Sequence, residues 1–224
     1  ASAIPNDEFY PLQWHYPQIG LPQAWDITTG DPGVIVAVVD TGVVLAHPDL
    51  QGNLIEGYDL ISDPAMALDG DGIDPNPDDP GDLSIQGVRS LFHGTHVAGT
   101  IAARSNDGTG VAGVAWNSKI MPIRVLGKGG GTDFDILEGI KYASGLPNAS
   151  GQFPARRADV INMSLGGPGL SSIFQDVIDQ ARTNGVIVVA AAGNDSANAD
   201  FYSPAGEDGV VTVSAVGFNR DVAS

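Results

Sequence analysis

Residues 34–42 of the chain read Val34-Ile35-Val36-Ala37-Val38-Val39-Asp40-Thr41-Gly42. An unbroken run of β-branched and small apolar residues is typical of a strand buried on both faces, as in a parallel sheet covered by helices. The run ends at Asp40, so we expect a carboxylate at the carboxyl end of a central strand. Open α/β sheets place their functional sites at that edge.

The rest of the chain alternates between similar apolar runs and helical patterns. Further strands are expected at residues 58–61, 120–126, 160–165, 186–192 and 210–216, the last two of them buried. Helices are expected from residue 93, from a cap at Thr132 or Asp133, and from a cap at Ser172. The alternation predicts an α/β fold in which helices sandwich a parallel β-sheet in three layers. No repeat or linker divides residues 1–224, so one domain is expected.

The charge of the chain narrows the classes of partner. Acidic residues outnumber basic ones by 27 to 10, which gives a net charge of −17. Nucleic acids and anionic membranes both require a positive face, so neither is expected as a partner. No apolar run approaches the length of a membrane span. An acidic surface instead suits cation binding.

Two histidines three residues apart open the stretch Phe92-His93-Gly94-Thr95-His96-Val97-Ala98-Gly99-Thr100. A helix starting near His93 would have Gly and Ala along one face and would pack closely on a sheet. His93 would then lie at the exposed N-terminal end of that helix. From these residues alone, a buried helix with an incidental histidine remains an open alternative.

Three stretches, 38–42, 93–99 and 191–194, carry a family resemblance when they are taken together and in order. They resemble the signature segments of the subtilisin-like serine proteases, with the secreted, calcium-dependent, thermitase-like bacterial branch the most similar. The resemblance implies a subtilisin-like fold and an extracellular serine endopeptidase that cleaves polypeptides. It further implies that His93 is the general base, that Asp40 orients its imidazole, and that Asn194 donates a hydrogen bond to the oxyanion.

The resemblance also implies where a substrate binds. In this family the peptide adds as a strand between two segments of the protein. Those segments correspond here to Gly129, Gly130 and Gly131 on one side and to Ser164, Leu165 and Gly166 on the other. Ala191, Ala192 and Gly193 would line the S1 pocket. We further hypothesise that Asp195 lies at the rim of this pocket and tolerates a basic P1 residue.

Calcium is the cofactor that the resemblance implies. One site would combine the carboxylates of Asp7, Asp49 and Asp107 with the carbonyls of Arg104, Thr109 and Val111. A second candidate is an acidic loop that lacks the EF-hand pattern and whose ligands would be Asp59, Asp63, Asp69, Asp71 and Asp74. A solvated acidic loop is the alternative for this second set.

The chain departs from the family at the nucleophile. The family carries its serine in a Gly-Thr-Ser-Met-Ala segment, which is absent from residues 1–224. We therefore expect residues 1–224 to be the N-terminal portion of the peptidase domain, inactive alone. The expected partner is a C-terminal fragment of the same protease that carries the serine, either as a second chain after a nick or as sequence simply missing here. A propeptide or peptide inhibitor is a further partner that the resemblance leaves open.

Two other functions stay open at this point. The missing serine is compatible with an inactive fragment or a calcium-binding scaffold. A metal-dependent hydrolase with His93, His96 and Asp40 as ligands is the other alternative. Its histidines are three residues apart, whereas the helical His-Glu-x-x-His zinc motif places them four apart.

Overall fold

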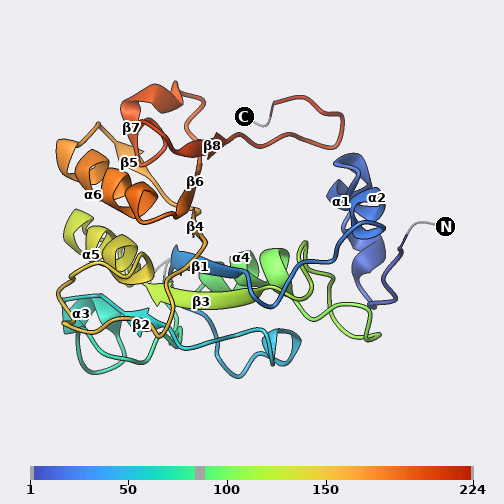
Figure 1. The fold of residues 1–224 in the computed structure, drawn as a ribbon, viewed down its shortest axis with the longest axis horizontal. Coiled ribbons are helices and arrows are strands. Elements are labelled where there is room, and N and C mark those ends of the chain that lie inside the picture. The colour runs from blue at the N-terminus through green and yellow to red at the C-terminus, as the bar shows by residue number, and fades with distance from the viewer. Residues whose placement is uncertain (1–2, 84–88, 223–224) are drawn as a thin grey trace.

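A computed structural model describes residues 3–83 and 89–222 of the chain. Its main sheet has six strands in the order β2-β3-β1-β4-β6-β8, and every neighbouring pair is parallel (Figure 1). The strands of this sheet are β1 (Ile35–Asp40), β2 (Tyr58–Asp59), β3 (Lys119–Arg124), β4 (Val160–Met163), β6 (Ile187–Ala191) and β8 (Val211–Val213). A second, antiparallel sheet pairs β5 (Gly167–Pro168) with β7 (Tyr202–Ser203).

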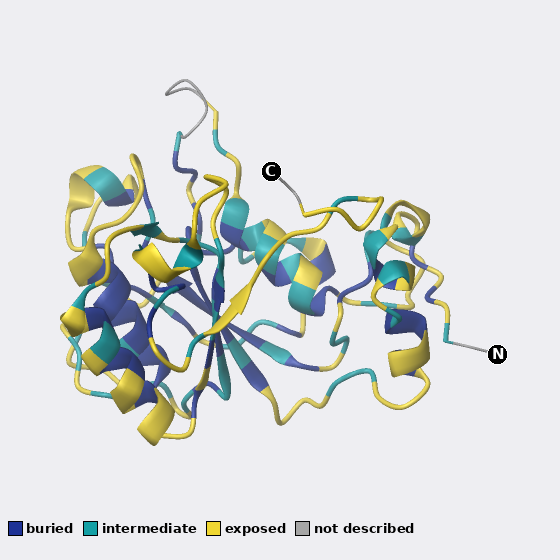
Figure 2. Ribbon diagram, turned by 90° about the horizontal axis from the view of Figure 1, so that it is seen from above, coloured by how far each residue is buried: buried dark blue, intermediate teal, exposed yellow. Residues whose placement is uncertain are grey.

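Helices cover both faces of the main sheet. The three long helices are α4 (His93–Ala102), α5 (Asp133–Ala143) and α6 (Ser172–Thr183). The short ones are α1 (His15–Gln18), α2 (Leu21–Trp25) and α3 (Pro64–Ala67). Viewed along the sheet, α4 lies on one side of the strands and the pair α5 and α6 lies on the other (Figure 2).

The side-chain alternation of β1 explains the layers. Ala37 and Val39 belong to the core cluster that includes the buried faces of α5 and α6. Val38 points to the opposite face, where it packs with Ala98 and Ala102 of α4. A strand with apolar residues on both faces needs a cover on each side. The predicted α/β fold with a helix-sandwiched parallel sheet is therefore confirmed.

Two local predictions were wrong. Val211 and Val213 of β8 are each 52% exposed, although residues 210–216 were expected to form a buried strand. The strand is the edge of the sheet, and all three of its residues are exposed in the described part of the chain. The N-cap of α6 is Ser171 rather than Ser172, because Ser171 still has extended backbone angles and its N–H bonds to Glu207.

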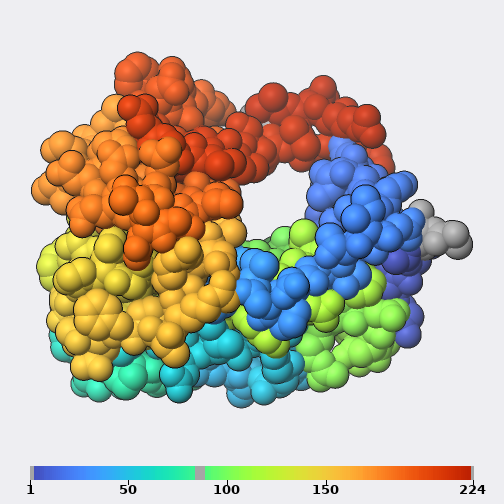
Figure 3. Space-filling view, viewed as in Figure 1, coloured from blue at the N-terminus to red at the C-terminus, as the bar shows by residue number. Residues whose placement is uncertain are grey.

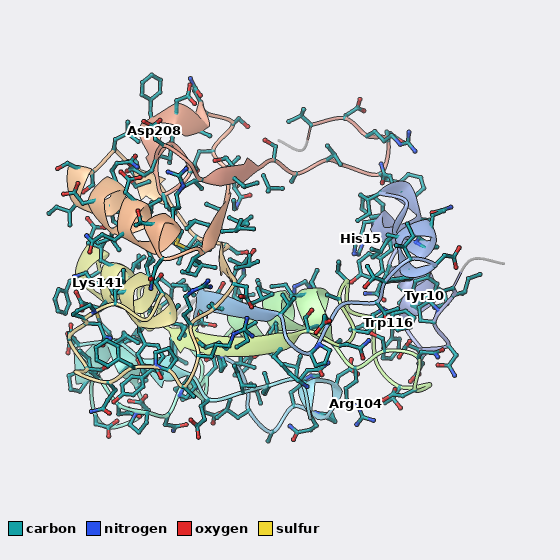
Figure 4. The ribbon with its side chains drawn as sticks, in the orientation of Figure 1. Tyr10, His15, Arg104, Trp116, Lys141 and Asp208 are labelled. Atoms are coloured by element: carbon teal, nitrogen blue, oxygen red, sulfur yellow. The ribbon has the colours of Figure 1, made fainter. Side chains whose placement is uncertain are left out.

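The N-terminal arm forms its own aromatic cluster at one end of the molecule. Tyr10, His15 and Trp116 lie together there in Figure 4, and the Trp25 and Trp116 rings are 5.0 Å apart. The C-terminal segment reaches this arm, since the Trp14 and Phe218 rings are 5.4 Å apart. A wide opening separates this C-terminal segment from the body of the molecule (Figure 3). No helix in residues 3–83 and 89–222 combines the length and apolar character needed to cross a membrane.

Candidate active site

The structure brings Asp40 and His93 into direct contact. Asp40 is the fully buried last residue of β1, and His93 is the first residue of α4. Nδ1 of His93 lies 2.8 Å and 2.9 Å from the two carboxylate oxygens of Asp40. This hydrogen bond raises the pKa of His93, and partial burial of the ring opposes the rise. With Nδ1 engaged, Nε2 is the ring nitrogen available for proton transfer.

Gly94 explains how the helix comes so close to the strand. A Cβ on Gly94 would lie 2.1 Å from the carbonyl oxygen of Gly42 and 3.1 Å from Cβ of Asp40. Any larger residue would therefore push the first turn of α4 away from the end of β1. Gly42 itself has a φ of +89°, which favours glycine there as well.

His93 opens into a hollow of about 370 Å³. Thr41, Asp82 and Leu126 line this hollow together with Gly129 and Gly130. The negative charge of Asp82 also contributes to the raised pKa of His93. A histidine at such a wall, with its inner nitrogen held by a carboxylate, suits a general base.

The two segments expected to hold a substrate line the same hollow. Residues 129–131 and 164–171 are among the lining of this hollow, which has a volume of about 530 Å³ and whose apolar residues include Leu126, Ile136 and Phe174. Gly129 and Gly130 belong to a tight turn in which Gly127 and Gly130 exchange backbone hydrogen bonds, and Gly167 and Pro168 pair with β7. Both segments thus line one hollow, and its 129–131 side includes a turn in which Gly129 and Gly130 have positive φ values.

A second hollow, of about 260 Å³, lies next to this groove. Ser164, Leu165 and Gly166 line it on one side, and residues 191–195 line it on the other. Asn194 and Asp195 are exposed and follow the end of β6. Because β1, β4 and β6 are parallel neighbours, Asp40, Ser164 and Asn194 all belong to the carboxyl edge of the sheet.

The loop 104–111 lies against the N-terminal arm and gathers the first candidate calcium ligands; Figure 4 labels Arg104 at its start. Oδ2 of Asp7 accepts the N–H of Asn106 at 2.7 Å. Oδ2 of Asp49 accepts the N–H of Val111 at 2.9 Å, whereas its Oδ1 is buried without a hydrogen-bond partner. Burial raises the pKa of Asp49, and the nearby charges of Asp107 and Asp7 add to the rise.

Other members of this set are also engaged within the loop. The Asp107 carboxylate pairs with the Arg104 guanidinium at 2.9 Å and accepts the N–H of Thr109 at 3.1 Å. The orphaned Oδ1 of Asp49 suits a hard cation such as calcium, but the carboxylates of Asp7, Asp49 and Asp107 do not bring one oxygen each to within 4.8 Å of one another.

The second candidate set is only partly assembled. Asp59, Asp69 and Asp74 can bring one oxygen each to within 4.8 Å of one another, and no other such group of metal-binding side chains occurs among the described residues. Asp63 lies outside this group, and its side chain caps α3 by accepting the N–H of Ala65. Asp71 contacts Asp74 but is likewise outside the group.

A positively charged side chain of the protein already pairs with two carboxylates of this acidic group. The guanidinium of Arg124, which is 1% exposed, bonds to the carboxylates of Asp59 and Asp69 and to the carbonyl of Ala67. Burial nonetheless raises the pKa of Asp59 to about 7, with Arg124 and a backbone hydrogen bond pulling the other way. Asp59 and Asp69 are thus paired with a cation of the chain, while residues 62–65 and 68–71 of the same loop are exposed to solvent.

His96 does not join His93. Its side chain is exposed and lines a different hollow, shared with His15 and His47. Within the described part of the chain, His93, His96 and Asp40 do not form a group of convergent metal ligands. The geometry thus gives no support to the metal-hydrolase alternative.

Sequence reasoning missed three residues around Asp40. Thr41, Asp79 and Arg124 are buried and lie next to it in the fold. The position of Thr41 directly after Asp40 was a usable signal. No local pattern marks Asp79, which lies 38 residues after Thr41 in the chain.

Comparisons with known proteins agree with this geometry. The family model described as Subtilase family, Peptidase_S8, matches residues 31–224. An extracellular protease of Xanthomonas campestris pv. campestris is 44% identical, over 96% of this chain and 39% of its own length. Thermitase of Thermoactinomyces vulgaris is 36% identical, over 98% of this chain and 68% of its own length.

Solved structures give the same result. A protease from Pseudoalteromonas arctica superposes with a TM-score of 0.90 and 49% identity, over 97% of this chain and 67% of that one. An extracellular basic protease of Dichelobacter nodosus is 42% identical over 95% of this chain. The chain spans 38% of the length of that protease and 39% of the length of the Xanthomonas relative. With its fold, its Asp40–His93 contact and a family match over most of its length, the chain belongs to the subtilase family.

Proposed function

We propose that this chain is the N-terminal portion of a single subtilisin-like peptidase domain in an extracellular serine endopeptidase. The observation that carries the proposal is the hydrogen bond of His93 Nδ1 to the buried carboxylate of Asp40. It fixes one imidazole nitrogen and leaves the other at the wall of a hollow. The names of the Xanthomonas and Dichelobacter relatives support secretion.

The chemistry follows from these positions. His93 would take the proton of a serine hydroxyl as that oxygen attacks the scissile carbonyl, and would return it to the leaving amine. Asp40 would hold the neutral tautomer and stabilise the imidazolium that forms. Asn194 would donate its side-chain amide to the developing oxyanion, an interaction that strengthens as the charge grows.

Polypeptides are the proposed substrates. An extended peptide would lie between Gly129–Gly131 and Ser164–Gly166 and send its P1 side chain into the hollow lined by Ala191, Ala192 and Gly193. The presence of Asp195 on the same hollow supports tolerance of a basic P1 residue. A loss of Lys and Arg cleavage in an Asp195→Ala variant, measured with a P1 library, is the expected result.

The serine is proposed to lie on sequence that follows residue 224 in the whole protein. The greater length of the relatives supports this placement. So do the exposed valines of β8, which is the unpaired edge of the sheet in the described residues. A propeptide or peptide inhibitor in the substrate groove would be a further partner of the same site.

Calcium is the proposed cofactor. Asp7, Asp49 and Asp107 would hold it, with carbonyls of Arg104, Thr109 and Val111, and the orphaned Oδ1 of Asp49 supports this assignment. A bound ion would crosslink the N-terminal arm to the loop that follows α4 and would stabilise the native state by mass action. For the second set, Asp59, Asp69 and Asp74 are the proposed ligands, beside Arg124.

The test uses the whole protein, meaning this chain with any sequence that flanks it. We expect a serine-directed fluorophosphonate to abolish casein hydrolysis, and a His93→Ala variant to be inactive while still folded. At saturating calcium and without added zinc, a chelator should inhibit casein hydrolysis no faster than the enzyme loses its calcium. Resistance to the fluorophosphonate together with rapid inhibition by a zinc chelator would instead favour a metal-dependent hydrolase. A folded whole protein without any peptidase activity would favour a calcium-binding scaffold.

A further inference from the structure

The first turn of α4 is capped by a residue from another element. A helix leaves its first backbone N–H groups without partners inside the helix, and a side chain at the N-cap usually satisfies one of them. The N-cap of α4, Phe92, has left-handed backbone angles and provides no such bond. Oγ1 of Thr41 accepts the N–H of Gly94 instead, at 3.0 Å.

Asp79 determines how that hydroxyl is oriented. The Thr41 hydroxyl has a single hydrogen, which it donates to Oδ2 of Asp79 at 2.7 Å. Its lone pairs are thereby left for Gly94. A carboxylate can only accept, so the direction of the bond between Thr41 and Asp79 is fixed as long as Asp79 is ionised.

Asp79 is itself held in place. It is 5% exposed, its Oδ1 accepts the N–H of Gly81 at 2.8 Å, and its own N–H bonds to the carbonyl of Val43 at 3.3 Å. The backbone N–H of Thr41 donates to Oδ1 of Asp40 at 2.8 Å. Thr41 therefore contacts both partners of the candidate pair: the carboxylate of Asp40 through its backbone, and the start of the His93 helix through its hydroxyl.

We propose that Asp79 is a positioning residue, which through the Thr41 hydroxyl fixes the His93 end of α4 against Asp40. The inference rests on the proposed protease function and adds a residue to its site. Asp79 would touch neither the substrate nor the imidazole. Its part is to keep the Nδ1–carboxylate contact at the geometry that the structure has, since a misplacement of about 1 Å costs roughly 100-fold in rate.

The charges around the two groups define what the pH profile reports. His93 faces the carboxylates of Asp40 and Asp82, and both raise its pKa. Asp79 faces the Thr41 hydroxyl, the Arg124 guanidinium and Asp82. Weakening the contact between His93 and Asp40 would lower the pKa of His93 and shift the acid limb of kcat/KM to lower pH.

The experiment compares kinetic parameters of variants of the whole protein. The concentration of active enzyme in each variant is first determined by titrating a separate sample with a fluorophosphonate. For Asp79→Asn and Thr41→Val we expect kcat to fall roughly 10- to 100-fold, KM to stay within about twofold, and the acid limb to move to lower pH. Thr41→Ser keeps the hydroxyl and should restore most of the kcat. Asp78→Asn is the matched control with a wild-type profile, because Asp78 lies on the same loop and its side chain bonds to the N–H of Leu45.

Each outcome decides the proposal. If Asp79→Asn does not fold, Thr41→Val removes the same link without an Asp79 change and carries the test. A wild-type kcat and acid limb in Thr41→Val, or a loss that Asp78→Asn shares, would overturn the positioning role. Activity that survives His93→Ala would instead refute the proposed function itself, so the two failures are distinguishable.

Discussion

Arg124 allows the internal ion pairs to be tested quantitatively. It ends β3, pairs in register with Asp40, and is 1% exposed while bonding to Asp59 and Asp69. Replacing it by methionine keeps most of the volume and removes the charge. Asp59, which is fully buried, then loses its counter-ion, and breaking a buried pair in this way costs about 3–5 kcal/mol.

The pH dependence of this loss has a definite sign. Burial already raises the pKa of Asp59 to about 7, well above the ordinary value of about 3.9. A carboxyl whose pKa is higher in the folded state binds protons more tightly when folded, so stability falls as pH rises from the unfolded to the folded pKa. Without Arg124 the folded pKa of Asp59 rises further. We therefore expect the cost of Arg124→Met to grow as pH rises above 7.

The assay is urea unfolding of the whole protein in a His93→Ala background, so that the proposed peptidase activity cannot digest the sample. Arg156→Met is the matched control, because Arg156 is about half exposed and pairs with Asp159 at the surface, where such a pair is worth about 0–1 kcal/mol. The double variant Asp59→Asn with Arg124→Met should lose less stability than the sum of the two single variants. Equal costs for Arg124→Met and Arg156→Met, with no pH dependence, would refute the role of Arg124 as an internal counter-ion.

Three further results are expected. Gly94→Ala should destabilise the whole protein by about 1–3 kcal/mol in urea unfolding and reduce kcat, because its Cβ would meet the Gly42 carbonyl at 2.1 Å; unchanged stability would contradict the close approach of α4. Asp49→Asn should lower the Tm measured in calcium and abolish the part of Tm that depends on calcium. A chelator titration of the wild-type protein and the variant measures this part, and an equal effect of the chelator on both would show that Asp49 is not a calcium ligand. In the proposed mechanism neutral His93 is the active form, and its hydrogen bond to Asp40 raises its pKa above the ordinary value of about 6.5, so kcat/KM should rise with pH through that raised value. Asp40→Ala should lower kcat by about 10⁴-fold and move the acid limb to lower pH. An unmoved acid limb would show that this limb does not report His93.

The architecture was largely predictable from the sequence. Apolar runs such as residues 34–39 and the small-residue face of residues 93–102 indicate which surfaces of the strands and helices must be buried against other elements. The pairing of Asp40 with His93 depended on the family resemblance, because composition and spacing alone did not exclude an incidental histidine. The exposure of β8 was not predictable from its apolar residues. Burial depends on what packs over a strand, which its own sequence does not contain.

The links around Asp40 were beyond sequence reasoning for a different reason. The Thr41–Asp79 and Arg124–Asp59 bonds join residues 38 and 65 positions apart. Local periodicity carries no information about such pairs. The acidic loop looked like a cation site from its composition, and only the fold shows that a guanidinium of the chain lies among its carboxylates.

The site of covalent labelling by a fluorophosphonate tests the central claim most directly. The whole protein would be labelled, digested and sequenced by mass spectrometry, alongside its His93→Ala variant. We expect one labelled serine, located after residue 224, and almost no labelling in the variant, because in the proposed mechanism His93 and Asp40 activate a hydroxyl that lies outside residues 1–224. A label on Ser164, Ser214 or another serine of this chain, or equal labelling without His93, would contradict the account.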